Sequence, residues 1–242
     1  MQPSPENIVL SYHQSITLMQ QLSSLAGVKV EMDYGKSRCL VLDQQGEKIL
    51  EFHYPLSFPA NPPGQNLISY AGALTANPIP YVILLMHAGQ SALGYFARGE
   101  MIQHKVIRKY MVRKKQGKAQ YKFQKEKKAH SQGARIRLAN TVSFFEEINT
   151  YLLDWFKSNP VEKIIYSCPL TLWSMLFRSK IDPPFQKEDP RLIKVPLHLP
   201  DPLLKTLLYI NHYVQSGQCK LYMQPGSESI KGLDIFFKSI SA

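Results

Sequence analysis

A dense block of positive charge in the middle of the chain limits how this sequence can fold. Residues 105–137 contain thirteen lysines and arginines and a single acid, Glu126. The net charge of this window is +12, whereas the whole 242-residue chain carries +11, so the remainder sums to −1. Residues 113–133 have few large apolar side chains beyond Tyr121 and Phe123 and cannot form a core of their own. This pattern predicts an exposed, mobile loop over 113–133, and the localised charge indicates a polyanionic partner.

The composition is that of a globular protein. With 44% hydrophobic residues, a chain of this length can bury a substantial core. Its longest apolar runs, such as 81–86, are too short to cross a bilayer, and the first residues lack the basic and apolar regions of a signal peptide. We therefore expect a cytoplasmic protein that does not use a membrane. Cys39, Cys168 and Cys219 are too few and too widely spaced to indicate a disulfide framework or a zinc site.

Residues 1–78 are expected to form a small N-terminal module. The spacing of apolar residues over 6–25 predicts an amphipathic helix. Three short apolar runs separated by turn sequences then predict an antiparallel meander. These runs cover residues 28–32, 39–42 and 49–52. Six prolines within residues 55–80 predict a connection with little regular structure.

Residues 79–242 are expected to form a second, mixed α/β domain. Three strands are predicted before the basic loop, over 81–86, 92–98 and 101–112. After the loop, apolar residues at steps of three and four predict a helix from Leu138 to Trp155. Beyond this helix strands and helices alternate, which favours an α/β layer with a partly parallel sheet. The alternating elements are strand 163–167, helix 170–177, strand 192–195, helix 202–215 and strand 220–223.

Common catalytic signatures are absent from the sequence. It contains no Gly-rich phosphate loop, no His-Glu-x-x-His and no Gly-x-Ser-x-Gly. The basic loop instead contains Gln116-Gly117-Lys118-Ala119-Gln120. Glycine and alanine allow the backbone to approach a ligand closely, and glutamine is an uncharged donor and acceptor. Such a tip could position water or a ribose hydroxyl and stabilise developing negative charge without a metal ion.

Aromatic residues lie among the cations of the basic window. They are Tyr110, Tyr121 and Phe123. Proteins hold single-stranded and folded RNA by contacts from lysine and arginine to phosphate and by stacking of bases on planar side chains. The window therefore has the side chains that an RNA-binding surface needs.

The order of residues over 94–155 carries a family pattern. In the family with this pattern, a strand reads His-Lys-Thr-Phe-His-Arg-Tyr. A basic Arg-x-Lys-x-Gly segment that ends at Gln follows, and a helix then begins with Ser-Ala-Gly-x-x-Leu-Arg-Arg-Tyr-Asn. The chain has the matching residue at His104, Lys105, Tyr110, Val112, Arg113, Lys115, Gly117, Gln120, Ser131, Gly133, Arg137 and Asn140. In these positions it resembles the release-factor-like domain of ribosome-rescue factors, which is related to the middle domain of the eukaryotic class I release factor. The animal member of this family is the ankyrin-repeat and zinc-finger peptidyl-tRNA hydrolase.

The chain also departs from this pattern. Ile107 and Arg108 replace the Phe-His pair of the strand. Leu138 and Ala139 replace the second Arg and the Tyr of the helix start, and Lys118-Ala119 precedes Gln120 where a stricter release factor carries glycine.

The resemblance implies a release-factor middle-domain fold, similar to ribonuclease H-like folds, with the helix and β-meander module added at the N-terminus. It implies a ribosome-rescue enzyme in which Gln120 is the working tip residue and Gly117 gives the loop its flexibility. The residues expected to hold RNA are Arg113, Lys114, Lys115, Lys118, Lys122, Arg135 and Arg137. The implied partners are the large ribosomal subunit, peptidyl-tRNA and ribosomal RNA, with no DNA, cofactor or metal ion, and the protein is expected to be a monomer.

Two chemistries and one non-catalytic function stay open from the sequence. The loop could hydrolyse the ester of peptidyl-tRNA, or it could cleave the tRNA near its 3′ end through the neighbouring 2′-hydroxyl. The alternative is a ribosome-associated or assembly factor whose basic loop only binds RNA.

Overall fold

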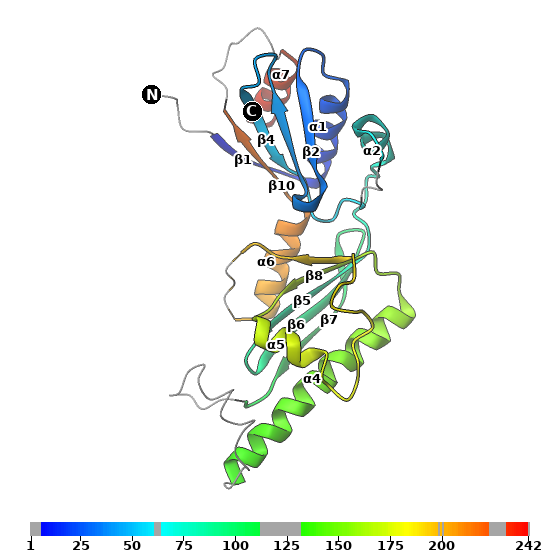
Figure 1. The fold of residues 1–242 in the computed structure, drawn as a ribbon, viewed down its shortest axis with the longest axis vertical. Helices are drawn as coiled ribbons and strands as arrows, with labels where there is room; N and C mark the ends of the chain where they lie inside the picture. Colours follow the sequence, from blue (N-terminus) through cyan, green and yellow to red (C-terminus); the bar gives the residue numbers. More distant parts are fainter. Residues whose placement is uncertain are drawn as a thin grey trace. The chain divides into compact units, whose positions relative to one another are not determined.

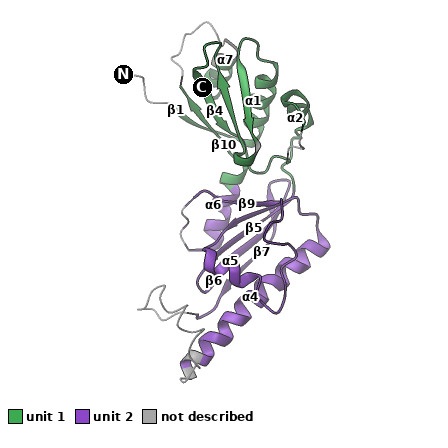
Figure 2. Cartoon of the chain, viewed as in Figure 1, with its two compact units in different colours: residues 1–79, 212–242 green, residues 80–211 purple. Residues whose placement is uncertain are grey.

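The chain folds into two compact units, each built on one five-stranded sheet (Figure 2). The computed structural model describes residues 6–60, 64–111, 132–197, 199, 201–222 and 231–241. Unit 1 comprises Met1–Ile79 and His212–Ala242, and unit 2 comprises Pro80–Asn211. None of the helices in these described ranges is both long enough and apolar enough to cross a membrane.

Unit 1 is an antiparallel sheet with its core on one face. The strand order is β1-β10-β4-β3-β2. The strands are β1 (Glu6–Leu10), β2 (Lys29–Asp33), β3 (Arg38–Leu42), β4 (Lys48–His53) and β10 (Gly217–Leu221). The helices are α1 (Tyr12–Ser24), the short η1 (Tyr34–Lys36), α2 (Leu67–Ala73) and α7 (Lys231–Ser241). The helices α1 and α7 lie on one face of the sheet (Figure 1). Their apolar side chains belong to one core with Phe52 and Val41, which are fully buried.

The antiparallel meander predicted in the N-terminal region is confirmed by β2, β3 and β4. The predicted helix over 6–25 is correct for α1 but wrong for residues 6–10, which form β1. Ser11 separates the two elements, because its side chain accepts a hydrogen bond from the Gln14 amide (3.3 Å) and its own amide donates to Gln14 Oε1 (2.8 Å). This capping box begins the helix at Tyr12 and leaves residues 6–10 to pair with β10.

Three further expectations need correction. Residues 55–80 contain the helix α2, which begins where the Asn66 side chain accepts a hydrogen bond from the Ser69 amide. The helix α7 was not predicted. The last strand lies between β1 and β4 of unit 1 and not in the second sheet, so residues 212–242 belong to unit 1 and not to the predicted second domain.

Unit 2 has a mixed sheet with the order β7-β6-β5-β8-β9. Strands β5, β6 and β7 are antiparallel neighbours, whereas β8 pairs parallel with β5 and with β9. The strands are β5 (Tyr81–His87), β6 (Gln90–Ala97), β7 (Glu100–Arg108), β8 (Lys163–Ser167) and β9 (Leu192–Lys194). The predicted mixed α/β fold with a partly parallel sheet is therefore confirmed.

Helices cover both faces of the unit 2 sheet (Figure 1). The helices α4 (Gln132–Ser158) and α5 (Leu170–Leu176) pack on one face, where Phe144, Ile148 and Leu152 of α4 are fully buried. The helix α6 (Leu204–Gln215) packs on the other face, and the Tyr81 hydroxyl donates a hydrogen bond to Asn211 Oδ1 (2.6 Å). This close packing needs the glycine at position 94, because a Cβ there would lie 2.9 Å from Leu207 Cδ2.

Candidate nucleic-acid interface

Most residues of the predicted site lie between β7 and α4, in residues 112–131, which are outside the described part of the chain. These are Arg113, Lys114, Lys115, Gly117, Lys118, Gln120 and Lys122. Their roles stay predictions. The structure does describe both ends of this segment, namely β7 with residues 109–111 on one side and α4 on the other.

The strand side of the segment is anchored as far as Met111. Strand β7 is an edge strand of the sheet, and Ile107 and Met111 are 2% and 1% exposed within the core that α4 covers. Beyond the strand, the Lys109 amide donates a hydrogen bond to the Gly89 carbonyl (2.8 Å). Gly89 has φ +77°, and a Cβ there would overlap the Lys109 carbonyl, so only glycine suits this turn. The backbone is therefore fixed up to the point where residues 112–131, the basic segment, begin.

Two of the cations in the basic window are paired with the side of α4. Lys109 Nζ lies 2.9 Å from Glu147 Oε2, and Lys105 Nζ lies 4.0 Å from Glu147 Oε1. Lys105 Nζ also lies 4.7 Å from the centre of the Tyr151 ring. A hydrogen bond with Tyr151, together with the charge of Glu147, raises the pKa of Lys105. These two lysines hold α4 beside β7, so they contribute to the framework of the site.

The beginning of α4 brings together residues of the family pattern. Asn140 Nδ2 donates a hydrogen bond to the Tyr110 carbonyl (3.0 Å), which ties the residues that follow β7 to the helix. Arg137 is 6% exposed, and a Cβ at Gly133 would lie 3.3 Å from Arg137 Nη1. The absence of a side chain at Gly133 thus leaves room for the guanidinium of Arg137 one helical turn later.

Arg135 and Arg137 were both predicted to bind RNA, but they occupy different environments. Arg135 is exposed, as a phosphate contact requires. Arg137 is buried, and its Nε has no hydrogen-bond partner in the described structure. Its carbonyl accepts a hydrogen bond from the Thr141 hydroxyl (2.8 Å). Arg137 is therefore a buried residue near the beginning of α4, and RNA binding by Arg137 stays a prediction.

Sequence reasoning missed Glu147 and Tyr151. Their only signal was a spacing of four residues, which places them on the same face of the predicted helix. That spacing did not show that the face would meet Lys105 and Lys109. Within the described ranges, no group of three or more histidine, cysteine, aspartate or glutamate residues is arranged to hold a metal ion.

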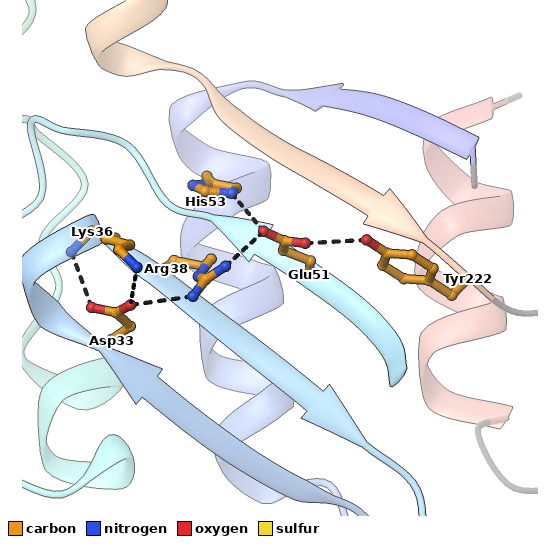
Figure 3. A network of polar contacts seen from close by, with 6 residues as sticks. All are labelled: Asp33, Lys36, Arg38, Glu51, His53 and Tyr222. Carbon is orange, nitrogen blue, oxygen red and sulfur yellow. Dashed lines mark hydrogen bonds and ion pairs between the residues drawn. The ribbon is translucent and has the colours of Figure 1, made fainter. Parts of the chain in front are cut away.

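Unit 1 carries a separate network of polar contacts centred on Glu51 (Figure 3). Glu51 is only 8% exposed. Its Oε1 accepts a hydrogen bond from Arg38 Nη1 (3.1 Å) and lies 3.0 Å from His53 Nε2, and its Oε2 accepts one from the Tyr222 hydroxyl (3.1 Å). Asp33 Oδ2 holds the other end of the Arg38 guanidinium (3.2 Å).

The Glu51 network serves the stability of unit 1. Burial alone would raise the pKa of Glu51, but hydrogen bonds from Arg38, His53 and Tyr222 lower it to about 2. Both carboxylate oxygens are already occupied by these partners. We therefore assign the network to holding β3, β4 and the residue after β10 together.

Comparisons of the sequence match this chain to a protein family and to curated proteins. A family model described as Bacteroidetes VLRF1 release factor matches residues 81–220. A curated protein from Homo sapiens named tRNA endonuclease ANKZF1 is 27% identical over 179 residues, which are 72% of this chain and 24% of that protein. The protein of the same name from Bos taurus is 30% identical over 142 residues, which are 57% of this chain and 19% of that protein. The chain thus spans about a quarter or less of the length of these relatives.

A solved structure also shares the fold. It is described as Vms1 mitochondrial localization core, and it covers 82% of this chain and 92% of its own length with a TM-score of 0.50. At 13% sequence identity, this likeness shows the fold alone. It confirms the prediction of a release-factor-like α/β fold.

Proposed function

The chain belongs to the Bacteroidetes VLRF1 release factor family, and on this premise we propose that it acts in ribosome quality control. Its substrate is peptidyl-tRNA on a stalled large ribosomal subunit, and its action frees the nascent chain. The family match and the curated relatives named tRNA endonuclease support this proposal. Gln120 and the cations of the basic segment are the residues that we assign to the reaction.

The observation that carries the proposal is the framework that presents the basic segment. Residues 112–131 contain eight lysines and arginines, one acid and Gln120. Met111, the last described residue before the segment, is buried, and α4 follows the segment. Glu147 of α4 pairs with Lys105 of β7 and with Lys109, and Asn140 of α4 bonds the Tyr110 carbonyl. A segment held at both ends can place an uncharged tip residue against RNA while its cations contact phosphates.

The names of the relatives favour tRNA strand cleavage as the reaction. The ribose 2′-hydroxyl next to the scissile phosphate attacks phosphorus, and the bond from phosphorus to the 5′ oxygen of the following nucleotide breaks. The 2′-hydroxyl proton passes to water, and the leaving oxygen takes a proton from solvent. The products are a tRNA ending in a 2′,3′-cyclic phosphate and a peptide that still carries the terminal nucleotides. Gln120 orients the 2′-hydroxyl, and the cations stabilise negative charge on the phosphate.

Purified large subunits that carry a stalled peptidyl-tRNA provide the test. We expect Gln120→Ala to retain subunit binding and to lower the rate of nascent-chain release by at least ~100-fold. Gln124→Ala is the matched control, since it removes a glutamine from the same segment outside the tip of residues 116–120, and it should release the chain at close to the wild-type rate. Mass spectrometry of the released peptide then identifies the bond that breaks.

The products separate the competing functions. A peptide that carries nucleotides, with a cyclic phosphate on the tRNA, supports strand cleavage. A peptide without nucleotides means ester hydrolysis, the reaction that the release-factor family name favours. Equal release by wild type and Gln120→Ala overturns the catalytic role of Gln120. If the wild-type protein binds the large subunit but releases no nascent chain, the protein is a non-catalytic RNA-binding factor.

A further inference from the structure

We propose that Asn140 is a positioning residue for this reaction, because it fixes the start of the basic segment relative to α4. This inference rests on the proposed function. Asn140 Nδ2 donates to the backbone carbonyl of Tyr110, and the donor and acceptor are 3.0 Å apart. The bond therefore holds main chain and not merely a side chain.

The bond connects residues on either side of the basic segment. Tyr110 is the second-last described residue before the basic segment, and Asn140 lies in the third turn of the helix that follows the segment. The bond joins the two flanks of the segment directly. The ion pair of Lys109 with Glu147 joins the same two elements through long side chains, which define the backbone position less closely.

The surroundings of the bond argue against a role in global stability. Tyr110 is 53% exposed, Asn140 is half-buried, and the hydrogen bond is open to solvent. The adjacent core consists of apolar residues such as Ile107, Met111 and Phe144, and Asn140 is not a member of it. Loss of the bond should therefore release the segment locally and leave unit 2 folded.

A shift of the backbone at Tyr110 would move the point from which the chain continues into the basic segment. Gln120 lies ten residues beyond Tyr110. Displacement of a reacting group by about 1 Å can cost a factor of ~100 in rate. We therefore expect the loss of this bond to lower the rate constant of the bond-breaking step and to leave subunit affinity unchanged.

The test compares Asn140→Ala and Asn140→Asp with Asn159→Ala. Asn159 is the matched control, because its Nδ2 donates to a backbone carbonyl, that of Trp155, at the far end of the same helix (3.1 Å). In single-turnover release from purified stalled large subunits, Asn140→Ala should be at least ~10-fold slower than wild type. Its subunit affinity and its melting temperature should match those of Asn159→Ala.

The Asn140→Asp variant supplies a readout that a purely structural defect would not produce. An ionised carboxylate cannot donate to the Tyr110 carbonyl, whereas a protonated carboxyl group can. The ratio of its release rate to that of wild type should therefore rise as the pH is lowered, and the ratio for Asn140→Ala should not. The inference is overturned if Asn140→Ala releases the nascent chain at the wild-type rate. It is also overturned if the release rate of Asn140→Ala falls only as much as its subunit affinity or its stability falls.

Hydrogen exchange of the free protein makes the inference testable apart from the proposed function. Asn140→Ala should speed amide exchange in peptides covering 105–111, and Asn159→Ala should not. If the wild type releases no chain, the proposed function fails, and the exchange data still decide whether Asn140 holds the segment. Unchanged exchange in Asn140→Ala overturns the inference whatever the release assay shows.

Discussion

At the scale of single residues, Glu51 illustrates a charge that the fold keeps buried. Three side chains from three places in the sequence surround its carboxylate, and together they outweigh the cost of burial. Arg38 and His53 are near Glu51 in the sequence, but Tyr222 is 171 residues away. No local pattern could have predicted that these groups meet, and sequence analysis did not identify Glu51 as a special residue.

We expect Glu51→Gln to destabilise unit 1 at neutral pH. Because the folded-state pKa of Glu51 is lowered from 4.5 to about 2, its charge contributes stability above about pH 4.5, and this contribution is lost as the pH falls towards 2. The full contribution is on the order of 3 kcal/mol. Urea unfolding followed by circular dichroism at pH 7 and pH 3 should show a deficit for Glu51→Gln that becomes smaller in acid.

Glu31→Gln is the control for this prediction. The Glu31 side chain is 45% exposed and pairs on the surface with Lys29, so its neutralisation should change stability by less than about 1 kcal/mol. A Glu51→Gln protein as stable as Glu31→Gln at pH 7 would contradict the assignment of the network to stability.

At the scale of elements, local patterns identified strands and helices better than they identified their ends or partners. The apolar spacing that predicts α4 and the runs that predict β5, β6 and β8 are properties of short segments, and the structure contains all four elements. The error over residues 6–10 has a different origin. These residues continue the apolar spacing of α1, and their pairing with β10 decides that they form a strand.

The contact of α6 with the unit 2 sheet makes a prediction at this scale. A Cβ at position 94 would lie 2.6 Å from a ring carbon of Phe96 and 2.9 Å from Leu207. We expect Gly94→Ala to destabilise unit 2 by roughly 1–3 kcal/mol, because α6 or the strand must shift. Both tryptophans, Trp155 and Trp173, lie in unit 2, so their fluorescence during urea unfolding measures the effect.

Gly72→Ala is a suitable comparison. Gly72 lies in α2, and among the described residues no atom outside its chain neighbours and the helix's own backbone lies within 4 Å of an added Cβ. Alanine favours a helix by roughly 0.5–1 kcal/mol over glycine, so this variant should be as stable as wild type or slightly more stable. Because Gly72 lies in unit 1 and both tryptophans lie in unit 2, urea unfolding of this variant is followed by circular dichroism. Equal stability of Gly94→Ala and wild type would show that α6 does not constrain this part of the sheet.

At the scale of the whole molecule, the two units are connected in a way that the linear sequence hides. Unit 2 is one continuous stretch, whereas unit 1 is assembled from both ends of the chain. Strand β10 lies between β1 and β4, so the C-terminal segment is central to the unit 1 sheet. Removal of residues 212–242 would leave β1 without a strand partner and would expose the edge of β4.

This arrangement predicts opposite behaviour for two fragments. Residues 80–211 should fold alone and unfold cooperatively with a change in tryptophan fluorescence, because this fragment contains the whole unit 2 sheet and α4. Residues 1–79 should be largely unfolded by circular dichroism, because the partner strand of β1 is missing. Addition of a peptide covering 212–242 should restore structure to the 1–79 fragment. A cooperatively folded 1–79 fragment would contradict the role assigned to β10.

The sequence by itself determined the features that depend on local order: the amphipathic α4, the strands of unit 2, the concentrated charge of 105–137 and the family pattern from His104 to Asn140. Tertiary structure alone decided which of these residues meet. It placed β10 in unit 1, brought Glu147 to Lys109, buried Arg137 and joined Asn140 to Tyr110. The physical reason is that periodicity and composition report which side of an element is apolar, whereas strand pairing and ion pairing depend on contacts between residues distant in the chain.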